Sequence, residues 1–532
     1  MADLGELDVL IIGGGMGGCI VATGLAEHGV HPETGERLKI AILERGPHFK
    51  GDTRPGYGIP LRRQLFTCVT PENRASTRYT MASGLSPEER DRKTRRRYVN
   101  TRRGDASAIG GGSLHWQCNT QVPFDLDYGA YAAETGVDWT PDKLRPAGEE
   151  IQRLFNIHSR PESLLTPGDF MFRDAAQALG HKVIPLTLAK TNCIGCSFCN
   201  LMCKYDAKMG PLITHVPLAE KLGVQIIPEA EVEKIILEKQ GARVVAKGAI
   251  YRHQGETQSV MAGKVLVACG THGTPALLFR SGYGRRDVLG SDLVVENENV
   301  GNNVDAKVAT ARIHAVFGQD IHDGEYRDGT FDLFQDVHDQ GYFDRLQVNF
   351  RVTRLPRDPY ALATDQSAPE FGREHKAFMR DIYILQRPHR VRAEYLTRGS
   401  IGISLVRPSG VLGKMDAYLD LEYDRTDPGT LQRLREGHEI GLEILKKMGA
   451  REIFESEEGV RITNVSGISS SCRAGSDRSN SVVNSDFESH DVDDLLICDQ
   501  SVQPRIASRG FGSPVAMFAT YAAQRMVAKY FS

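Results

Sequence analysis

The first part of the chain alternates between apolar, glycine-rich and helical stretches. Residues 8–12 form a short apolar run typical of a buried parallel strand, and residues 13–18, five glycines and one methionine, follow it without a spacer. Residues 19–28 have helical character, and a second apolar strand at 38–43 ends in Glu44. The order of strand, tight turn, helix and strand predicts the beginning of an α/β domain.

The spacing of the glycines indicates a nucleotide site at this turn. Gly13 permits the tight turn out of the strand, Gly15 lets the main chain approach a pyrophosphate, and Gly18 lets the helix pack closely on the sheet. The phosphates then bind at the helix N-terminus, and Glu44 can accept hydrogen bonds from ribose hydroxyls. The polar insertion 31–37 explains why this acid comes later than usual. Together these features predict dinucleotide binding rather than a purely structural turn.

A different pattern occupies the middle of the chain. From 306 to 454 the glycine signals thin, and strand-like segments such as 346–351 and 401–405 appear. An amphipathic helix is expected over 431–448, with a final helix opening at 513 and running through 523. Two kinds of pattern in one chain predict more than one domain, as does the length of 532 residues.

Composition narrows the functional classes. A hydrophobic content of 40% and a charged content of 25% are those of a soluble globular protein, and the formal charge of -3 gives no electrostatic case for nucleic acid. No apolar run reaches the length of a transmembrane helix. The acidic segment 1–6 leaves no room for a signal peptide, which predicts a cytoplasmic location. Export together with a partner subunit that carries the signal is also compatible with this sequence.

Four of the ten cysteines fall in one short stretch, at Cys193, Cys196, Cys199 and Cys203. The C-x2-C-x2-C-x3-C spacing is typical of bacterial ferredoxins and predicts an iron–sulfur cluster. A structural zinc site would more often show two separated CxxC pairs, and redox-active or free thiols are the remaining alternative. In two-cluster ferredoxins the fourth cysteine serves the other cluster and precedes proline, whereas Lys204 follows here. Both [4Fe-4S] with four ligands and [3Fe-4S] with three therefore remain open.

A second glycine-rich stretch, 108–116, reads Ala-Ile-Gly-Gly-Gly-Ser-Leu-His-Trp. Together with the first glycine motif it resembles the flavin-contacting loop of the glucose-methanol-choline (GMC) oxidoreductases. Its sequence is most similar to that of pyranose oxidases and of the iron–sulfur-containing catalytic subunits of bacterial FAD-dependent sugar dehydrogenases. In some pyranose oxidases the histidine that matches His115 is covalently bonded to FAD, and in other relatives it is not, so both states are open here.

The resemblance also implies an architecture and a set of FAD contacts. It predicts a Rossmann-like FAD-binding domain over 1–310 with an iron–sulfur insertion at 185–210. Within that range, the composition of 51–100, rich in Arg, Pro, Thr and Gly with little periodicity, favours a solvated, lid-like loop over a binding patch. A substrate domain built on an antiparallel sheet would follow over 311–454, and 455–532 would return to the FAD-binding domain. The residues that the resemblance assigns to FAD are Gly111, Gly112, Ser113, His115, Val232 and Asp499.

The resemblance fails at the catalytic bases. GMC enzymes oxidise alcohols with a histidine before a Gly-Thr pair and a second His or Asn before a proline, and these positions here are Gly467 and Ser513. Serine at its free pKa cannot act as the base unaided. The loop before Ser513 supplies Arg505 and Arg509, so electrostatic stabilisation by arginine is the alternative to a relocated base.

These observations lead to three functional hypotheses. The first is an FAD-dependent dehydrogenase that oxidises a CH–OH group of a sugar, glycoside or other alcohol and passes electrons through the cluster to an external acceptor, such as a ferredoxin, a cytochrome or a small partner subunit. The second is a flavin and iron–sulfur reductase or desaturase that acts on a C–C or C–N bond. The third is a non-catalytic flavin protein with a structural zinc site.

Overall fold

The structure is a computed structural model. It describes residues 4–49, 107–114, 116, 118, 120, 125–159, 162, 165–185, 187–193, 203, 205–310, 313–319, 321, 333–336, 346–353, 397–405, 412–415, 421–422, 424–455, 459–462, 464–507 and 512–532. The predicted lid-like loop 51–100, and the part of the predicted substrate domain at 354–396, therefore fall outside the described residues.

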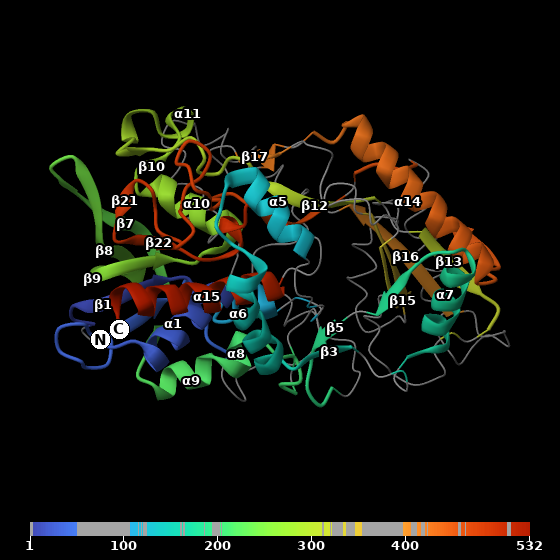
Figure 1. Cartoon of the computed structure of the whole chain (residues 1–532), viewed down its shortest axis with the longest axis horizontal. Helices are drawn as coiled ribbons and strands as arrows, with labels where there is room; N and C mark the ends of the chain where they lie inside the picture. Colours follow the sequence, from blue (N-terminus) through green and yellow to red (C-terminus); the bar gives the residue numbers. More distant parts are fainter. Residues whose placement is uncertain are drawn as a thin grey trace.

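Two large sheets, seen at the left and the right of Figure 1, organise the chain. The first has a parallel centre in the order β6 (Gln225–Ile227), β2 (Ile40–Leu43), β1 (Leu7–Ile12), β9 (Glu256–Val267) and β22 (Leu495–Ile497). Every residue of β2 is buried, as is all of β1 except Asp8, which agrees with a sheet covered on both faces. The predicted Rossmann-like domain is confirmed.

An antiparallel extension lengthens the first sheet. β7 (Ala230–Gln240) and β8 (Arg243–His253) pair with each other, and β8 pairs with the outer part of β9. The short β21 (Val492–Asp493) adds to β8 from the C-terminal end of the chain. Strands from both ends of the sequence therefore meet in the same sheet.

Helices from both ends of the chain also pack together. α1 (Met16–His28) lies beside α15 (Gly512–Tyr530), as Figure 1 shows, and a Cβ at Gly24 would come within 2.7 Å of the Cβ of Ala523. α6 (Pro141–Leu154) also packs on α15, and the ring centroid of Trp139, just before α6, lies 4.6 Å from that of Phe518. The final helix begins near the predicted residue but continues seven residues further, because its buried face extends to Met526.

The second sheet is antiparallel, as predicted from the sequence. Its order is β19 (Glu452–Phe454), β13 (Ile313–Phe317), β16 (Thr397–Leu405), β15 (Leu346–Thr353), β14 (Leu333–Asp336) and β4 (Val183–Pro185), with β12 (Asp305–Ala309) joining β16 to β20 (Asn464–Ser469). Three of these strands, β4, β12 and β20, lie outside the range 311–454. The domain boundaries at 310 and 454 stay predictions.

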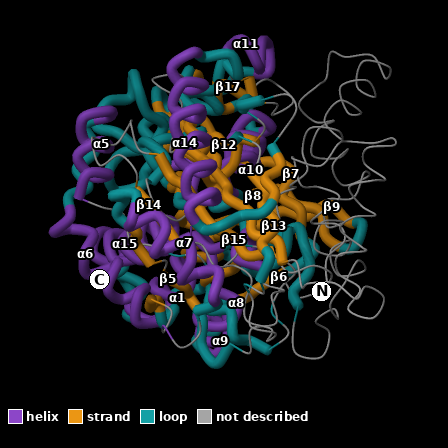
Figure 2. The backbone as a smooth tube through the Cα atoms, turned by 90° about the vertical axis from the view of Figure 1, so that its right-hand side faces the viewer, coloured by secondary structure: helices purple, strands orange, loops and turns teal. Residues whose placement is uncertain are grey.

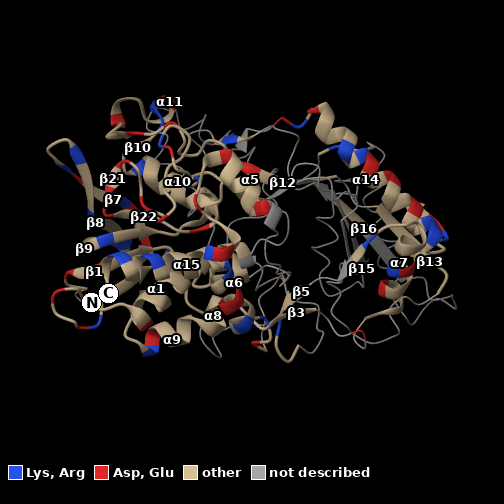
Figure 3. Ribbon diagram, viewed as in Figure 1, with Lys and Arg blue, Asp and Glu red and all other residues tan. Residues whose placement is uncertain are grey.

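Two capped helices cover one face of this sheet. α14 (Pro428–Lys447), which crosses in front of the strands in Figure 2, starts earlier than predicted because the side chain of Asp427 accepts a hydrogen bond from the amide of Thr430. α7 (Pro167–Ala178) begins with a capping box between Thr166 and Asp169. Figure 3 shows Lys, Arg, Asp and Glu interspersed along α14, while Leu434 and Ile444 of that helix are buried in the core of the second sheet.

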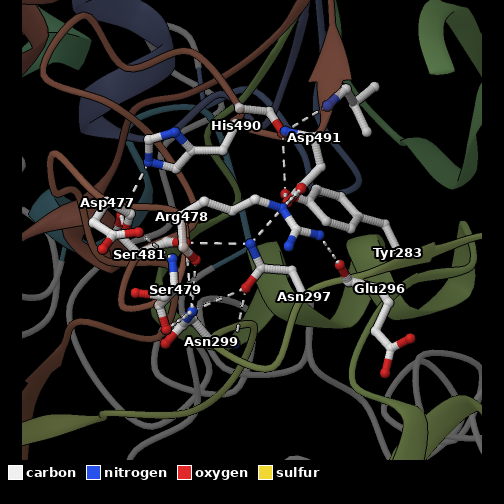
Figure 4. A network of polar contacts seen from close by, with 12 residues as sticks. Tyr283, Glu296, Asn297, Asn299, Asp477, Arg478, Ser479, Ser481, His490 and Asp491 are labelled. Atoms are coloured by element: carbon white, nitrogen blue, oxygen red, sulfur yellow. Dashed lines mark hydrogen bonds and ion pairs between the residues drawn. The ribbon is translucent and has the colours of Figure 1, made fainter. Parts of the chain in front are cut away.

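A network of polar contacts ties the C-terminal segment to the first domain (Figure 4). The carboxylate of Asp491 accepts hydrogen bonds from the hydroxyl of Tyr283 at 2.9 Å and from Nδ2 of Asn297 at 2.8 Å, and it pairs with Arg478. Nδ2 of Asn299 donates to the carbonyl of Arg478 at 3.2 Å. Residues after 470 are therefore fixed to the segment around 283–299.

The remaining described elements are short, apart from α5 and α10. They are η2 (Gly111–Leu114), α5 (Asp125–Thr135), β3 (Ile157–Ser159), β5 (Thr187–Ala189), α8 (Pro211–Thr214), α9 (Val216–Lys221), α10 (Gly270–Arg280), β10 (Tyr283–Gly284), α11 (Arg286–Leu289), η5 (Gly290–Asp292), β11 (Val295–Glu296), β17 (Lys414–Met415), β18 (Leu421–Glu422) and η6 (Gln500–Val502). Among the helices in the described ranges, none combines the length and apolar character needed to cross a membrane.

Candidate active site

The first glycine turn joins β1 to α1, and its glycines differ in how much space a side chain would have. A Cβ at Gly13, whose φ is +105°, would lie 2.5 Å from the carbonyl oxygen of Ala268, and one at Gly18 would lie 2.0 Å from the oxygen of Gly13. A Cβ at Gly15 would meet its nearest described atom, the oxygen of Ala268, only at 3.8 Å. The fold therefore requires glycine at 13 and 18, whereas the open space at Gly15 is suited to a bound phosphate group.

The second glycine-rich stretch packs directly on the first. The amide of Gly110 donates to the carbonyl of Gly14 at 2.7 Å, and a Cβ at Gly111 would lie 2.8 Å from Cα of Gly15. Ser113 is buried and its hydroxyl donates to the carbonyl of Gly110, whereas Gly112 is exposed. The structure thus brings the two predicted FAD-contacting stretches together. His115 lies outside the described residues.

Glu44 is held over the first turn by the main chain. Its Oε2 accepts a hydrogen bond from the amide of Gly14 at 2.8 Å, and its Oε1 accepts one from the amide of Gly46 at 2.9 Å. The side chain is buried, so these two bonds fix its orientation. Because each carboxylate oxygen has a second lone pair, Glu44 keeps acceptor capacity for a ribose hydroxyl.

Val232 and Asp499, the two other residues that the resemblance assigns to FAD, are both buried. Val232 is buried near the start of β7, and its carbonyl accepts a hydrogen bond from Nη2 of Arg280. Asp499 lies beside the first turn of α1, since a Cβ at Gly17 would be 3.4 Å from its Cα. Its carboxylate accepts hydrogen bonds from the amide of Gly270 at 2.9 Å and from the hydroxyl of Thr274 at 2.5 Å.

Charged groups converge on Cys269 between these elements. Burial, with smaller contributions from the carboxylates of Asp499 and Glu44, raises the pKa of the Cys269 thiol to about 12, although Arg45 and Arg280 act in the opposite direction. The thiol is therefore neutral and unreactive at physiological pH. The two arginines at this place carried no recognisable signal in the sequence.

The structure describes only part of the catalytic candidates near the C-terminus. Gly467 lies in β20 with φ at +62°. A histidine would adopt this backbone conformation only with strain, so the backbone here favours the glycine that replaces the family's base. Ser513 is the second residue of α15, but its side chain and the whole of Arg509 lie outside the described residues.

The third candidate, Arg505, is buried in an ion-pair cluster. Its Nη2 lies 2.6 Å from Oε1 of Glu134 in α5, and its Nη1 lies 4.0 Å from Oδ2 of Asp305 at the start of β12. Arg473 pairs with the same oxygen of Glu134 at 3.1 Å. Arg505 thus connects the helix α5 with the strand that leads into the second sheet, and its catalytic role stays a prediction.

The described residues that flank the cysteine-rich segment, 189–191 and 207–209, pair as the two strands of a hairpin, the cysteine hairpin. Lys190 and Lys208 form an antiparallel bridge. On either side of it, the amide of Thr191 donates to the carbonyl of Ala207, and the amide of Met209 donates to the carbonyl of Ala189. Cys193 is exposed and Cys203 is partly exposed, whereas Cys196 and Cys199 fall outside the described residues. No cluster of three metal-ligating side chains occurs in the described part of the chain, which contains only two of the four cysteines. The metal site therefore stays a prediction.

The base of this hairpin is attached to the second glycine-rich stretch. The amide of Ala189 donates to the carbonyl of Cys118 at 2.9 Å, and the amide of Thr120 donates to the carbonyl of Thr187 at 3.0 Å. Nζ of Lys208 donates to the carbonyls of Leu114 at 2.7 Å and Trp116 at 3.0 Å. Sequence reasoning missed Lys208, because a lysine after the cysteines carries no sign that it is buried.

Comparison with known families decides what this arrangement is. Two sequence models described as GMC oxidoreductase match residues 7–308 and 414–519. The chain belongs to the GMC oxidoreductase family. The family implies FAD, and the open space at Gly15, the orientation of Glu44 and the meeting of the two glycine stretches fit that cofactor.

Curated relatives match this GMC oxidoreductase over part of their length. An uncharacterised GMC-type oxidoreductase of Sinorhizobium fredii is 28% identical over 289 residues, covering 53% of this chain and 50% of the relative. A cholesterol oxidase of Mycobacterium tuberculosis is 24% identical over 306 residues, covering 52% of this chain and 48% of the relative. The chain thus spans about half the length of these two relatives.

Solved structures show the same fold over the whole chain. A pyridoxine 4-oxidase from Mesorbium loti has a TM-score of 0.63 at 16% identity, covering 98% of this chain and 99% of that one. A formate oxidase of Aspergillus oryzae has a TM-score of 0.62 at 15% identity, covering 100% of this chain and 99% of that one. At these identities the likeness concerns the fold, and it confirms the predicted GMC architecture.

Proposed function

We propose that this GMC oxidoreductase is an FAD-dependent dehydrogenase that oxidises a CH–OH group of a sugar, glycoside or other alcohol. In this proposal, electrons leave through an iron–sulfur cluster held by the thiolates of Cys193, Cys196, Cys199 and Cys203. The observation that carries it is the attachment of the cysteine hairpin to the glycine-rich stretch, through Lys208 and the main chain of Cys118. A metal centre in that hairpin would lie close to the flavin loop.

The residues assigned to FAD divide by their geometry. The main chain at Gly13, Gly15 and Gly18 would bind the pyrophosphate together with the N-terminus of α1, and Glu44 would bind ribose hydroxyls. The main chain of Val232 would meet the adenine. The remaining FAD contacts in the proposal are Gly111, Gly112, Ser113, His115 and Asp499.

An iron–sulfur cluster is the feature that separates a dehydrogenase from an oxidase. Bound FAD supplies hydride acceptance at the substrate carbon, and a cluster moves electrons singly to a carrier such as a ferredoxin, a cytochrome or a small partner subunit. An enzyme that reduces oxygen directly has no obvious need for such a centre. The indole Nε1 of Trp116 is buried and has no hydrogen-bond partner among the described residues, and a cluster sulfur would provide an acceptor.

The chain's own residues bind and orient the substrate in this proposal. Arg505 and Glu134 hold the start of the loop that leads to α15, and Arg509 in that loop and Ser513 at the start of α15 would face the substrate. A guanidinium there would stabilise negative charge developing on the substrate oxygen as its proton leaves. Relatives named cholesterol oxidase and long-chain-alcohol oxidase support an alcohol as the substrate class.

One observation favours a second function. Gly467 has a positive φ and no side chain, and Ser513 replaces the second base, so neither family base position carries a group that deprotonates an alcohol unaided. A flavin and iron–sulfur reductase or desaturase acting on a C–C or C–N bond would not need that pair.

Anaerobic titration of the purified protein distinguishes these functions. Iron, sulfide and zinc are measured first, and candidate sugars and alcohols are then added while flavin absorbance and the paramagnetic signal of the cluster are followed. The proposal expects iron and sulfide, bleaching by an alcohol, and slower reduction of an external carrier in Cys196→Ser. A reduced flavin that is reoxidised only by a compound with a C–C or C–N double bond would favour the reductase. Zinc without iron, and no bleaching by any substrate, would indicate a non-catalytic flavin protein.

A further inference from the structure

Arg280, the last residue of α10, holds the start of β7 with part of its guanidinium. Its Nε donates to the carbonyl of Glu233 at 2.8 Å, and its Nη2 donates to the carbonyl of Val232 at 3.1 Å. The third nitrogen, Nη1, is shielded from solvent and has no acceptor in the described part of the chain. A buried donor of this kind usually meets an acceptor that water or a ligand supplies.

An irregularity in β7 explains the two bonds and the orientation of the guanidinium. The pairing of β7 with β8 shifts by one residue just after Val232, so Glu233 is the extra residue of a β-bulge. The bulge presents two successive carbonyls to one side chain. Next to Arg280, the hydroxyl of Ser281 accepts a hydrogen bond from the amide of Ile235 at 2.9 Å, which ties the end of α10 to the same strand. The direction in which Nη1 points is therefore fixed.

The order of the groups in a dinucleotide indicates what lies next to Arg280. The pyrophosphate would bind at Gly15, and Glu44 at the end of β2 would bind the ribose, so the base would lie beyond Glu44. The main chain beyond Glu44 is the start of β7, because the amide of Ala230 donates to the carbonyl of Glu44 at 2.8 Å. Val232, two residues further on, is the residue that Arg280 holds. The guanidinium therefore lies on the side of the site where the adenine would be.

Cys269 connects Arg280 with the nucleotide turn. Its thiol donates to the carbonyl of Ile12, the last residue of β1 before the first glycine, at 3.2 Å. Arg280 and Glu44 both influence the pKa of this thiol, so both side chains lie near it. Arg280 is thus close to the carboxyl ends of β1 and β2, where nucleotides bind in open α/β sheets.

We propose that Nη1 of Arg280 donates a hydrogen bond to a ring nitrogen of the FAD adenine. The ring nitrogens N1, N3 and N7 of adenine are neutral acceptors, and the other two nitrogens of the guanidinium are already bonded to main-chain carbonyls. Because Nη1 is already buried in the folded protein, a bond to the base adds affinity without further desolvation of this donor. The inference rests on the assignment of FAD to this site in the proposed function, and it is independent of the electron acceptor.

The test uses full-length protein produced under riboflavin limitation, so that chains without FAD are obtained. The probe is ADP, which carries the adenine, the ribose and the pyrophosphate but no flavin that could become covalently attached. Calorimetry compares its binding with that of the three analogues in which N1, N3 or N7 is replaced by a C–H group. Arg280→Met is compared with Arg286→Met, which alters an exposed arginine paired with Glu296 at the surface. FAD binding is measured by flavin fluorescence in each variant.

We expect one analogue to bind wild-type protein at least about tenfold more weakly than ADP, as for loss of a hydrogen bond to a charged donor. In Arg280→Met that ratio should fall below about twofold, because the donor is absent. Arg286→Met should keep the wild-type ratio. Arg280→Met also loses two bonds to β7 and should unfold at a lower temperature, but a ratio between two ligands of one variant cancels that effect.

The remaining results contradict the inference in distinguishable ways. Wild-type protein that binds neither FAD nor ADP overturns it together with the proposed function. Protein that binds FAD but not ADP, or that binds all three analogues as tightly as ADP, overturns the inference alone. So does a ratio that Arg280→Met leaves unchanged, because another group would then contact the ring. If Arg280→Met does not fold, Arg280→Gln, whose amide can still donate to the carbonyl of Val232, takes its place.

Discussion

Gly15 and Gly111 come from two turns far apart in the sequence, yet a Cβ on Gly111 would lie 2.8 Å from Cα of Gly15. The amide of Gly110 donates to the carbonyl of Gly14 beside them. Each turn therefore limits the position of the other. A substitution in either turn acts on the nucleotide site and on the contact between the turns.

The first prediction separates binding from folding at the first turn. Gly15→Ala has space for a Cβ on the protein side, so the melting temperature of the apoprotein should stay near that of the wild type while FAD affinity falls. Gly18→Ala places a Cβ 2.0 Å from a carbonyl oxygen and should destabilise the fold by about 1–3 kcal/mol. Calorimetry and FAD titration measure both effects. Gly129→Ala, in an exposed part of α5 with no atom near its Cβ, is the control. Equal FAD affinity in Gly15→Ala and wild type would contradict the assignment.

The second prediction concerns Glu44. In Glu44→Gln the amide nitrogen must face the amide of Gly14 or of Gly46, so two donors would oppose each other in a buried site. The cost should be about 1–3 kcal/mol in stability, and FAD should bind more weakly. Glu33→Gln, at an exposed position, should change neither quantity. Denaturant unfolding and FAD titration are the measurements, and unaltered binding in Glu44→Gln would remove Glu44 from the site.

The third prediction is a loss of stability in acid that depends on His215. Burial lowers the pKa of His215 from 6.5 to about 4, so the unfolded chain binds this proton more readily than the folded chain. The stability from His215 is complete above pH 6.5 and is lost as pH falls towards 4, up to about 3 kcal/mol. Urea unfolding at several pH values should show a smaller slope over this window in His215→Gln. His28→Gln, at an exposed position, should keep the wild-type slope.

The fourth prediction tests whether Arg505 acts in catalysis or in folding. Its guanidinium is buried against Glu134, so Arg505→Met should destabilise the protein by about 3 kcal/mol, because a half-buried carboxylate loses one of its two cations. Arg243→Met, which removes a pair at the surface, should cost less than about 1 kcal/mol. Thermal unfolding measures both. A variant Arg505→Met with wild-type stability but without substrate-driven flavin reduction would favour the catalytic role.

The sequence predicted the local elements well where a short stretch contains its own signal. The first strand, glycine turn and helix lie where the apolar pattern indicates, and Glu44 faces the turn as the nucleotide motif requires. The structure adds that both oxygens of Glu44 are bound by main-chain amides. That detail depends on Gly46 folding back, which no motif describes.

Non-local features were beyond the sequence for a physical reason. β4 and β20 join the second sheet through hydrogen bonds to strands more than a hundred residues away, and a strand of three residues, such as β4, or of six, such as β20, has too little pattern to reveal so distant a partner. Lys208 was missed for the same reason, because burial of a lysine is a property of the packed chain. The catalytic candidates at 509 and 513 depend on a loop outside the described residues.

The crossing of the chain between the two sheets has a consequence for biosynthesis. β20 closes the second sheet and β22 closes the first, and both come from the last part of the polypeptide. A ribosome that has released only the stretch before β20 has therefore finished neither layer. We expect folding to be completed after translation, and a nascent chain arrested before β20 to remain sensitive to protease throughout.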